Sequence, residues 1–134
     1  MILREEPLAA LKNELLAAEE VLNTRYSFDL AEPNYDRCLE IIQSAPELQY
    51  EFAELLTSLL QSEALSSEPV AYLMRVLRWK EVYDWAETQL ATLPDVIVTG
   101  VAHRKVLEAY EKDWEHEEFY RRFSKKNNIH PKSS

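Results

Sequence analysis

The sequence contains a single glycine, Gly100, among 134 residues. Tight hairpins between strands depend on glycine or on Asn-Gly pairs, because their backbone has to reach positive φ. The chain has no Asn-Gly or Asp-Gly pair, and no segment of useful length alternates strictly between apolar and polar residues. These absences argue against a hairpin-built sheet and predict an all-α fold.

Glycine scarcity also bears on nucleotide binding. A Walker loop, a Gly-x-Gly-x-x-Gly turn and a Gly-x-Ser-x-Gly elbow each require at least two glycines at fixed spacing. With one glycine the chain can build none of them. We therefore predict no nucleotide cradle and no cofactor.

Cysteine and long apolar runs are equally scarce. Cys38 has no second cysteine with which to form an internal disulfide, and the start Met-Ile-Leu-Arg-Glu-Glu-Pro lacks the regions of a secretory signal. Charges interrupt every hydrophobic run before it reaches the roughly 18 residues that span a bilayer. These features predict a cytoplasmic protein without a membrane partner. Cys38 shares a predicted helix side with Ile41 and Ile42, which favours a core residue over a nucleophile.

What the chain does contain is typical of one globular domain. Hydrophobic residues make up 46% of it and charged residues 29%, and its length suffices to bury a core. Start signals and apolar stripes predict six helices, at about 7–22, 34–43, 46–61, 68–78, 81–92 and 101–123. We expect this domain to cover 1–124, with a polar tail at 125–134.

Local signals support several of these helix ends. Pro7 suits the first turn of a helix, and Ser44 and Glu47 have the spacing of a capping box. Residues 23–33 read as an ordered loop and 96–99 as a buried helix start or connector. The helices form either a compact bundle or a short stack of helical hairpins.

The segment from Pro69 to Leu90 carries a resemblance. Its first half, Val-Ala-Tyr-Leu-Met-Arg-Val-Leu-Arg, is leucine-rich, and its second half, Val-Tyr-Asp-Trp-Ala, brings small residues inside. This pair resembles one HEAT-like repeat and covers about a sixth of the chain. No second copy recurs at a fixed period. The resemblance implies stacked hairpins, and an irregular bundle remains the alternative.

Charge is the feature that departs most from average. The net charge is −9; residues 1–100 carry 7 basic and 18 acidic side chains, whereas 101–134 carry 8 and 6. Between 29 and 68 the only basic residue is Arg37. An anionic stretch of this kind repels nucleic-acid phosphates and attracts basic proteins. We therefore predict a basic protein partner and no nucleic-acid binding.

The candidate partner-binding residues lie within this stretch. Glu47, Glu51 and Glu54 share one helix face at i, i+4 and i+7, and Asp36 and Glu40 share another just before it. We call these five residues the acidic set, and we expect their potential to reach solvent because almost no basic residue is nearby. A solvated acidic face without a function is the alternative interpretation.

Small size, acidity and HEAT-like helices together resemble, in character, the small immunity proteins of bacterial toxin systems. Many of those proteins neutralise cationic nucleases. The resemblance implies a bacterial inhibitor that occludes the site of a basic toxin, with electrostatics accelerating the encounter.

A competing class would use the residues from Asp113 to Glu118. Asp113 and His116 would share a face of the predicted last helix at i, i+3. A di-iron bundle, however, uses paired Glu-x-x-His motifs plus two further glutamates, and this chain offers one degenerate version. We therefore predict no metal site and no catalytic residues. A metal-binding or enzymatic bundle and an oligomeric scaffold stay open as alternatives.

The remaining charged residues carry no motif of their own. Arg121, Arg122, Lys125 and Lys126 are expected to complement the dipole at the end of the last helix. His103 and His130 have no sequence neighbours that would poise them as a general base.

Overall fold

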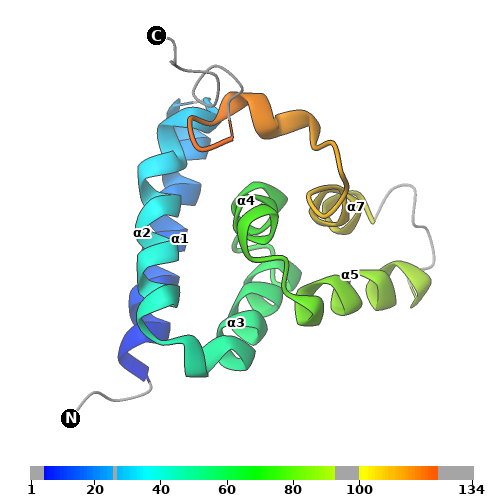
Figure 1. The fold of residues 1–134 in the computed structure, drawn as a ribbon, viewed down its shortest axis with the longest axis horizontal. Helices are drawn as coiled ribbons and strands as arrows, with labels where there is room; N and C mark the ends of the chain where they lie inside the picture. Colours follow the sequence, from blue (N-terminus) through cyan, green and yellow to red (C-terminus); the bar gives the residue numbers. More distant parts are fainter. Residues whose placement is uncertain (1–4, 26, 93–99, 124–134) are drawn as a thin grey trace, which may run out of the picture.

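The computed structural model describes residues 5–25, 27–92 and 100–123. Over these residues the chain forms six α-helices and three short 3-10 helices with no strand, which confirms the all-α prediction (Figure 1). The α-helices are α1 (Glu5–Arg25), α2 (Glu32–Ser44), α3 (Gln49–Gln61), α4 (Ser67–Leu77), α5 (Lys80–Thr92) and α7 (Val101–Glu108). The 3-10 helices are η1 (Phe28–Ala31), η2 (Pro46–Leu48) and η3 (Glu115–Phe119).

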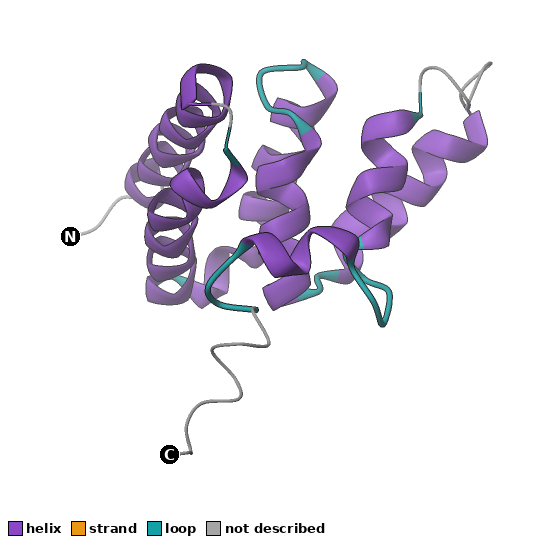
Figure 2. Ribbon diagram, turned by 90° about the horizontal axis from the view of Figure 1, so that it is seen from above, coloured by secondary structure: helices purple, strands orange, loops and turns teal. Residues whose placement is uncertain are grey.

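The helices are arranged as neighbouring pairs. Figure 2 shows α1 beside α2 at one end, α3 with α4 in the middle, and α5 with α7 at the other end. The pairs are joined because α4 packs against both α2 and α7, and α3 packs against α5. After α7 the chain crosses back over the molecule to the N-terminal end of α2 (Figure 1). We call residues 109–123 the C-terminal segment.

Apolar residues at helical spacing explain which face each helix buries. On α1, Leu11, Leu15 and Ala18 are fully buried and face α2 in the largest helix contact of the fold. Cys38 is likewise fully buried on α2, which confirms it as a core residue. Burial raises the pKa of its thiol to about 12, so the reactive thiolate is suppressed near neutral pH.

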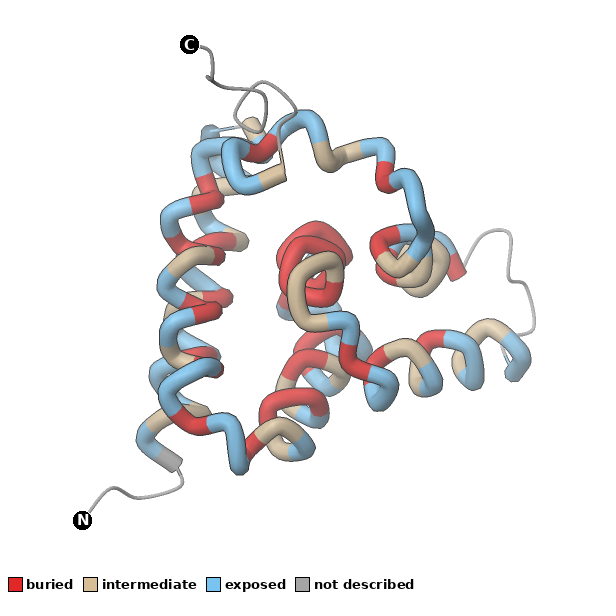
Figure 3. Tube along the Cα trace, viewed as in Figure 1, coloured by how far each residue is buried: buried red, intermediate tan, exposed pale blue. Residues whose placement is uncertain are grey.

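The middle of the core is α4. Every residue from Ser67 to Met74 is buried, and Figure 3 shows this helix buried around its circumference. Full burial of a large apolar side chain contributes about 1.5–3 kcal/mol, so a helix buried on all sides dominates the core. Its position lets polar side chains on α4 reach both α2 and the C-terminal segment.

Two helix ends use residues other than glycine in the left-handed region. Glu63 after α3 has a φ of 66°, and Arg78 after α4 has a φ of 52°. A non-glycine residue there costs about 1–2 kcal/mol. Arg78 offsets part of this because its guanidinium donates to the Tyr110 carbonyl and lies 5.8 Å from the centre of the Tyr110 ring.

The predicted final helix at 101–123 is wrong, because α7 ends at Glu108. Trp114 and Tyr120 have extended backbones, with φ values of −109° and −116°. The chain therefore changes direction at both residues, and their side chains enter the core at 5% and 1% exposure. A continuous helix would have carried this segment away from α2.

The capping box at Ser44 is also wrong. The Ser44 hydroxyl donates back to the Ile41 carbonyl at 2.6 Å, and η2 begins without a side-chain cap. The other predicted helices agree with the structure to within three residues at each end. The interpretations of 96–99 and of the tail at 125–134 lie outside the described residues.

None of the helices in the described ranges combines the length and the apolar character that a bilayer span requires.

Candidate functional site

The acidic set is spread along α2, η2 and α3, and Asp36 lies nearer the N-terminal end of α2. Asp36 and Glu40 are on α2, Glu47 is on η2, and Glu51 and Glu54 are on α3. The side chains of Glu40, Glu47 and Glu54 are exposed, whereas Asp36 and Glu51 are half-buried.

Arg37, the basic residue nearest to this set in the sequence, binds a carboxylate outside the set. Arg37 points to α1, where its Nε donates to Glu14 Oε2 at 3.0 Å. Within 5–25, 27–92 and 100–123, no lysine or arginine forms an ion pair with Glu40, Glu47 or Glu54. The charge of these three carboxylates therefore faces solvent.

Asp36 departs from the expectation for the acidic set. Its Oδ1 accepts a hydrogen bond from Arg122 Nη2 at 2.7 Å and lies 3.4 Å from the Tyr72 hydroxyl. Arg122 comes from the C-terminal segment, which the sequence placed on a helix leading away from this point. The expectation that no basic side chain neutralises the set is therefore wrong for Asp36.

A buried carboxylate on α2 holds the C-terminal segment in place. Glu32 is 5% exposed and accepts hydrogen bonds from the Tyr72 hydroxyl at 2.8 Å and from the backbone N–H groups of Arg121 and Arg122 at 2.8 and 3.1 Å. A buried charge is tolerated only when it is hydrogen-bonded in this way. Glu32 thus fixes the chain directly after η3.

A second buried carboxylate, on α4, completes the attachment. Glu68 is 6% exposed, and it accepts hydrogen bonds from the Tyr120 hydroxyl and from His116 Nδ1, the latter at 2.8 Å. A carboxylate can only accept, so Nδ1 of His116 carries the proton in this contact. The ring of His116 also stacks on Phe28 at 4.9 Å.

Arg75 on α4 holds the chain that follows α7. Its guanidinium donates to the carbonyls of Ala109, Glu111 and Lys112 and forms an ion pair with Glu117 at 2.9 Å. These carbonyls lie just beyond α7, and Arg75 supplies them with donors from inside the fold. The chain can therefore leave the helix without orphaning its backbone.

Three tyrosines pack between these carboxylates. The ring centres of Tyr35, Tyr72 and Tyr120 lie 4.6, 4.8 and 6.0 Å apart, and all three side chains are buried. Burial raises the pKa of each phenol, since the phenolate would lose its hydration.

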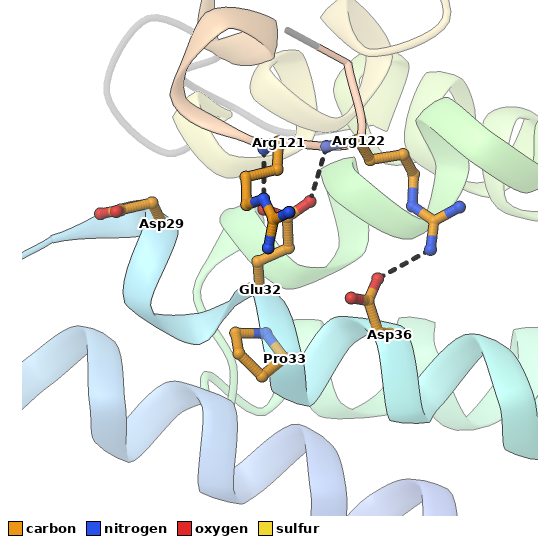
Figure 4. Close-up of a pocket in the computed structure, with 6 residues that line it drawn as sticks. All are labelled: Asp29, Glu32, Pro33, Asp36, Arg121 and Arg122. Carbon is orange, nitrogen blue, oxygen red and sulfur yellow. Dashed lines mark hydrogen bonds and ion pairs between the residues drawn. The ribbon is translucent and has the colours of Figure 1, made fainter. Parts of the chain in front are cut away.

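A hollow of about 450 Å³ lies where α2 and the C-terminal segment meet (Figure 4). Glu32 and Asp36 project into it from α2, and Arg121 and Arg122 approach from the opposite wall. Across this hollow Asp36 forms an ion pair with Arg122, and Glu32 accepts hydrogen bonds from the backbone N–H groups of Arg121 and Arg122. These contacts therefore attach the C-terminal segment to α2. The lining residues are Asp29, Glu32, Pro33, Asp36, Arg121 and Arg122.

Asp113 and His116 do not share a helix face as predicted. Asp113 precedes η3, whereas His116 lies on η3 with its ring against Glu68, and Glu117 faces Arg75. In the parts of the chain that the structure covers, no three side chains of His, Cys, Asp or Glu gather as a metal would need.

The remaining basic residues and histidines have separate surroundings. Arg121 and Arg122 do not complement a helix dipole, because α7 ends well before them, and Arg122 Nε instead donates to the Tyr72 hydroxyl at 2.9 Å. His103 packs against the Trp85 ring at 5.1 Å, and burial lowers its pKa. His130, Lys125 and Lys126 lie outside the described residues.

Sequence reasoning missed Glu32, Glu68 and Arg75. Each contacts residues more than thirty positions away, so no local spacing reveals it. The available signal was the density of aromatic residues after Glu108, which exceeds what one helix face can bury.

No family model matches the chain, and neither a curated protein nor a solved structure matches it.

Proposed function

We propose that the protein is a binding module, not an enzyme, that docks a basic protein through the acidic set. Glu40, Glu47 and Glu54 are its principal contacts. The observation that carries the proposal is that these three carboxylates are exposed without an ion-pair partner among the described residues, while Arg37 is engaged by Glu14.

Electrostatics gives this surface a physical role. Clustered like charges create a potential that raises the rate at which an oppositely charged partner arrives. Salt shortens the reach of that potential, to about 8 Å at physiological ionic strength. Binding to the acidic set is therefore expected to be fast in low salt and slower in high salt.

The partner we propose is a toxin whose active site binds an anionic substrate such as nucleic acid. A basic active-site surface would accept the acidic set in place of the phosphates, and the body of the domain would block access. On this proposal the protein is a bacterial, cytoplasmic immunity protein. A HEAT-like framework stays part of the proposal; in the structure α4 packs mainly against α7, and α5 packs against α7 and α3.

The competing metal or enzymatic function draws no support from the geometry. His116 and Glu117, the central residues of the Asp113–Glu118 stretch, are engaged by Glu68 and Arg75. An oligomeric scaffold has no specific observation in its favour.

The test begins with capture of the partner from the source cell, using the wild-type protein as bait. The association rate of the purified partner is then measured by stopped flow across a range of salt concentrations. The test variant carries Glu40, Glu47 and Glu54 changed to Lys. The matched control carries the same charge change at Glu20, Glu108 and Glu111, which are exposed on other elements.

We expect the test variant to associate at least about tenfold more slowly than wild type, with most of the salt dependence lost. The control should retain the larger part of the wild-type rate, because its charges lie away from the acidic set. An undiminished rate in the test variant, or equal slowing in the control, would place the interface elsewhere.

A further inference from the structure

Tyr50 is an exposed aromatic residue on α3, and in the sequence it lies between Glu47 and Glu54 of the acidic set. This side chain is 61% exposed, more than any other exposed large hydrophobic side chain of the described residues. It lies on the first turn of α3, three residues after Glu47 and four before Glu54. A tyrosine in such a position leaves a broad apolar ring in water.

The ring of Tyr50 is held in one orientation. Its hydroxyl donates to Glu54 Oε2 at 2.9 Å, across one turn of the same helix. This hydrogen bond to a carboxylate raises the pKa of the phenol, so the donor stays protonated well into the alkaline range. A side chain that is already ordered loses less entropy when a partner binds.

The other exposed aromatic side chains are engaged with one another. Phe28, His116 and Phe119 form ring contacts at 4.9–5.2 Å between η1 and η3. No ring of the described residues contacts Tyr50. Its exposed surface is therefore available to a group from another molecule.

We propose that Tyr50 is the anchor of the interface and receives an arginine side chain of the basic partner. The proposal rests on the proposed function and names the group that the acidic set recognises. A guanidinium can lie flat on the phenol ring while its N–H groups reach the carboxylate of Glu54.

Charge complementarity and shape together favour arginine over lysine. The guanidinium is planar and weakly hydrated, so it stacks on an aromatic ring and keeps its in-plane donors for carboxylates. An ammonium is compact and strongly hydrated, so it gains mainly from the carboxylates. Tyrosine is also among the residue types that contribute most to binding energy in protein interfaces.

The test uses two probes, oligoarginine and oligolysine peptides of equal length, and measures each Kd by calorimetry at low salt. The variants are Tyr50→Ala, Tyr50→Phe, Phe119→Ala, and the Glu40, Glu47 and Glu54 to Lys triple change. Tyr50→Phe keeps the ring but not the hydroxyl. Phe119→Ala removes a 48% exposed ring outside the acidic set. Circular dichroism verifies that each variant is folded.

Tyr50→Ala should weaken oligoarginine binding about two- to fivefold and remove the preference for arginine over lysine. Tyr50→Phe should stay within about twofold of wild type, and Phe119→Ala should have no effect. Unchanged oligoarginine binding by Tyr50→Ala, while the triple change abolishes it, would overturn the role of Tyr50 and leave the proposed function standing. Wild-type binding by the triple change would overturn the proposed function itself.

Discussion

Glu32 and Glu40 lie on the same helix, about two turns apart, and have opposite environments. Glu40 is exposed and has no ion-pair partner among the described residues, whereas Glu32 is 5% exposed and accepts three hydrogen bonds. The first carboxylate adds to the field outside the protein. The second accepts the hydrogen bonds that hold the C-terminal segment.

This contrast changes how the net charge should be interpreted. The charge of −9 counts Glu32, Glu68 and Asp36 together with Glu40 and Glu47. Asp36 is paired with Arg122, so these two charges largely cancel, whereas Glu32 and Glu68 are buried where no group of a partner can reach them. A partner therefore meets the exposed part of the acidic set and not the whole anionic stretch.

The largest effect on stability is expected at alkaline pH. Tyr35, Tyr72 and Tyr120 have folded-state pKa values raised above the unfolded value of about 10, so their stabilising effect is complete below pH 10 and is lost above it. One pH unit above that value, the three phenols together should remove about 4 kcal/mol from the free energy of unfolding.

Tyrosinate absorbance and circular dichroism, followed together through an alkaline titration, check this expectation. The buried phenols should ionise only as ellipticity is lost, whereas exposed Tyr50 can ionise in the folded protein. Complete ionisation of all tyrosines with ellipticity intact would show that the cluster around Glu32 and Glu68 is open to water.

The next largest effect is expected at Glu32. Glu32→Ala leaves the Tyr72 hydroxyl and two backbone N–H groups without their acceptor, which should cost about 3 kcal/mol. Glu40→Ala on the same helix should change stability by no more than about 0.5 kcal/mol. Urea denaturation measures both variants. Equal effects from the two substitutions would contradict the contrast between them.

A smaller difference in stability is expected between substitutions of two arginines. Arg75→Met removes the donors for the carbonyls after α7 and should cost about 2 kcal/mol. Arg37→Met removes a half-exposed ion pair with Glu14 and should cost less than about 1 kcal/mol. Thermal unfolding of the two variants checks the order, and a larger loss for Arg37→Met would reverse it.

The smallest effect on stability is expected at His103, which is not one of the carboxylates compared above. Its folded-state pKa is lowered by burial, so its stabilising effect is present above the unfolded value of about 6.5 and is lost as pH falls through it. The ring is partly solvated, so the change should stay below about 0.5 kcal/mol. His103→Gln should remove that part of the acid sensitivity. An unaltered pH profile would contradict the assignment.

The helices before residue 93 could be predicted because apolar spacing reports burial directly on a continuous helix. The C-terminal segment could not, because its aromatic residues serve different contacts. On one helix, Tyr110 and Trp114 would face one side and Phe119 and Phe123 nearly the opposite side. That scatter is a signal against a single amphipathic helix.

The candidate site also has one part that the sequence predicted and one part that it did not. Composition and helical spacing selected the acidic set, and Glu40, Glu47 and Glu54 are exposed as expected. The engagement of Asp36 by Arg122 joins residues 86 positions apart, and the bonds to Glu32 span about as far. Only the folded chain brings such residues together.

The most direct test of the account is a titration of the labelled protein with oligoarginine, followed residue by residue through the carboxyl resonances in NMR. If the exposed carboxylates bind the peptide, Glu47 and Glu54 should show saturable shifts, with smaller or no shifts for Glu32 and Glu68. Shifts of equal size at the buried carboxylates, or none at Glu47 and Glu54, would contradict the claim that the exposed acidic set carries the binding.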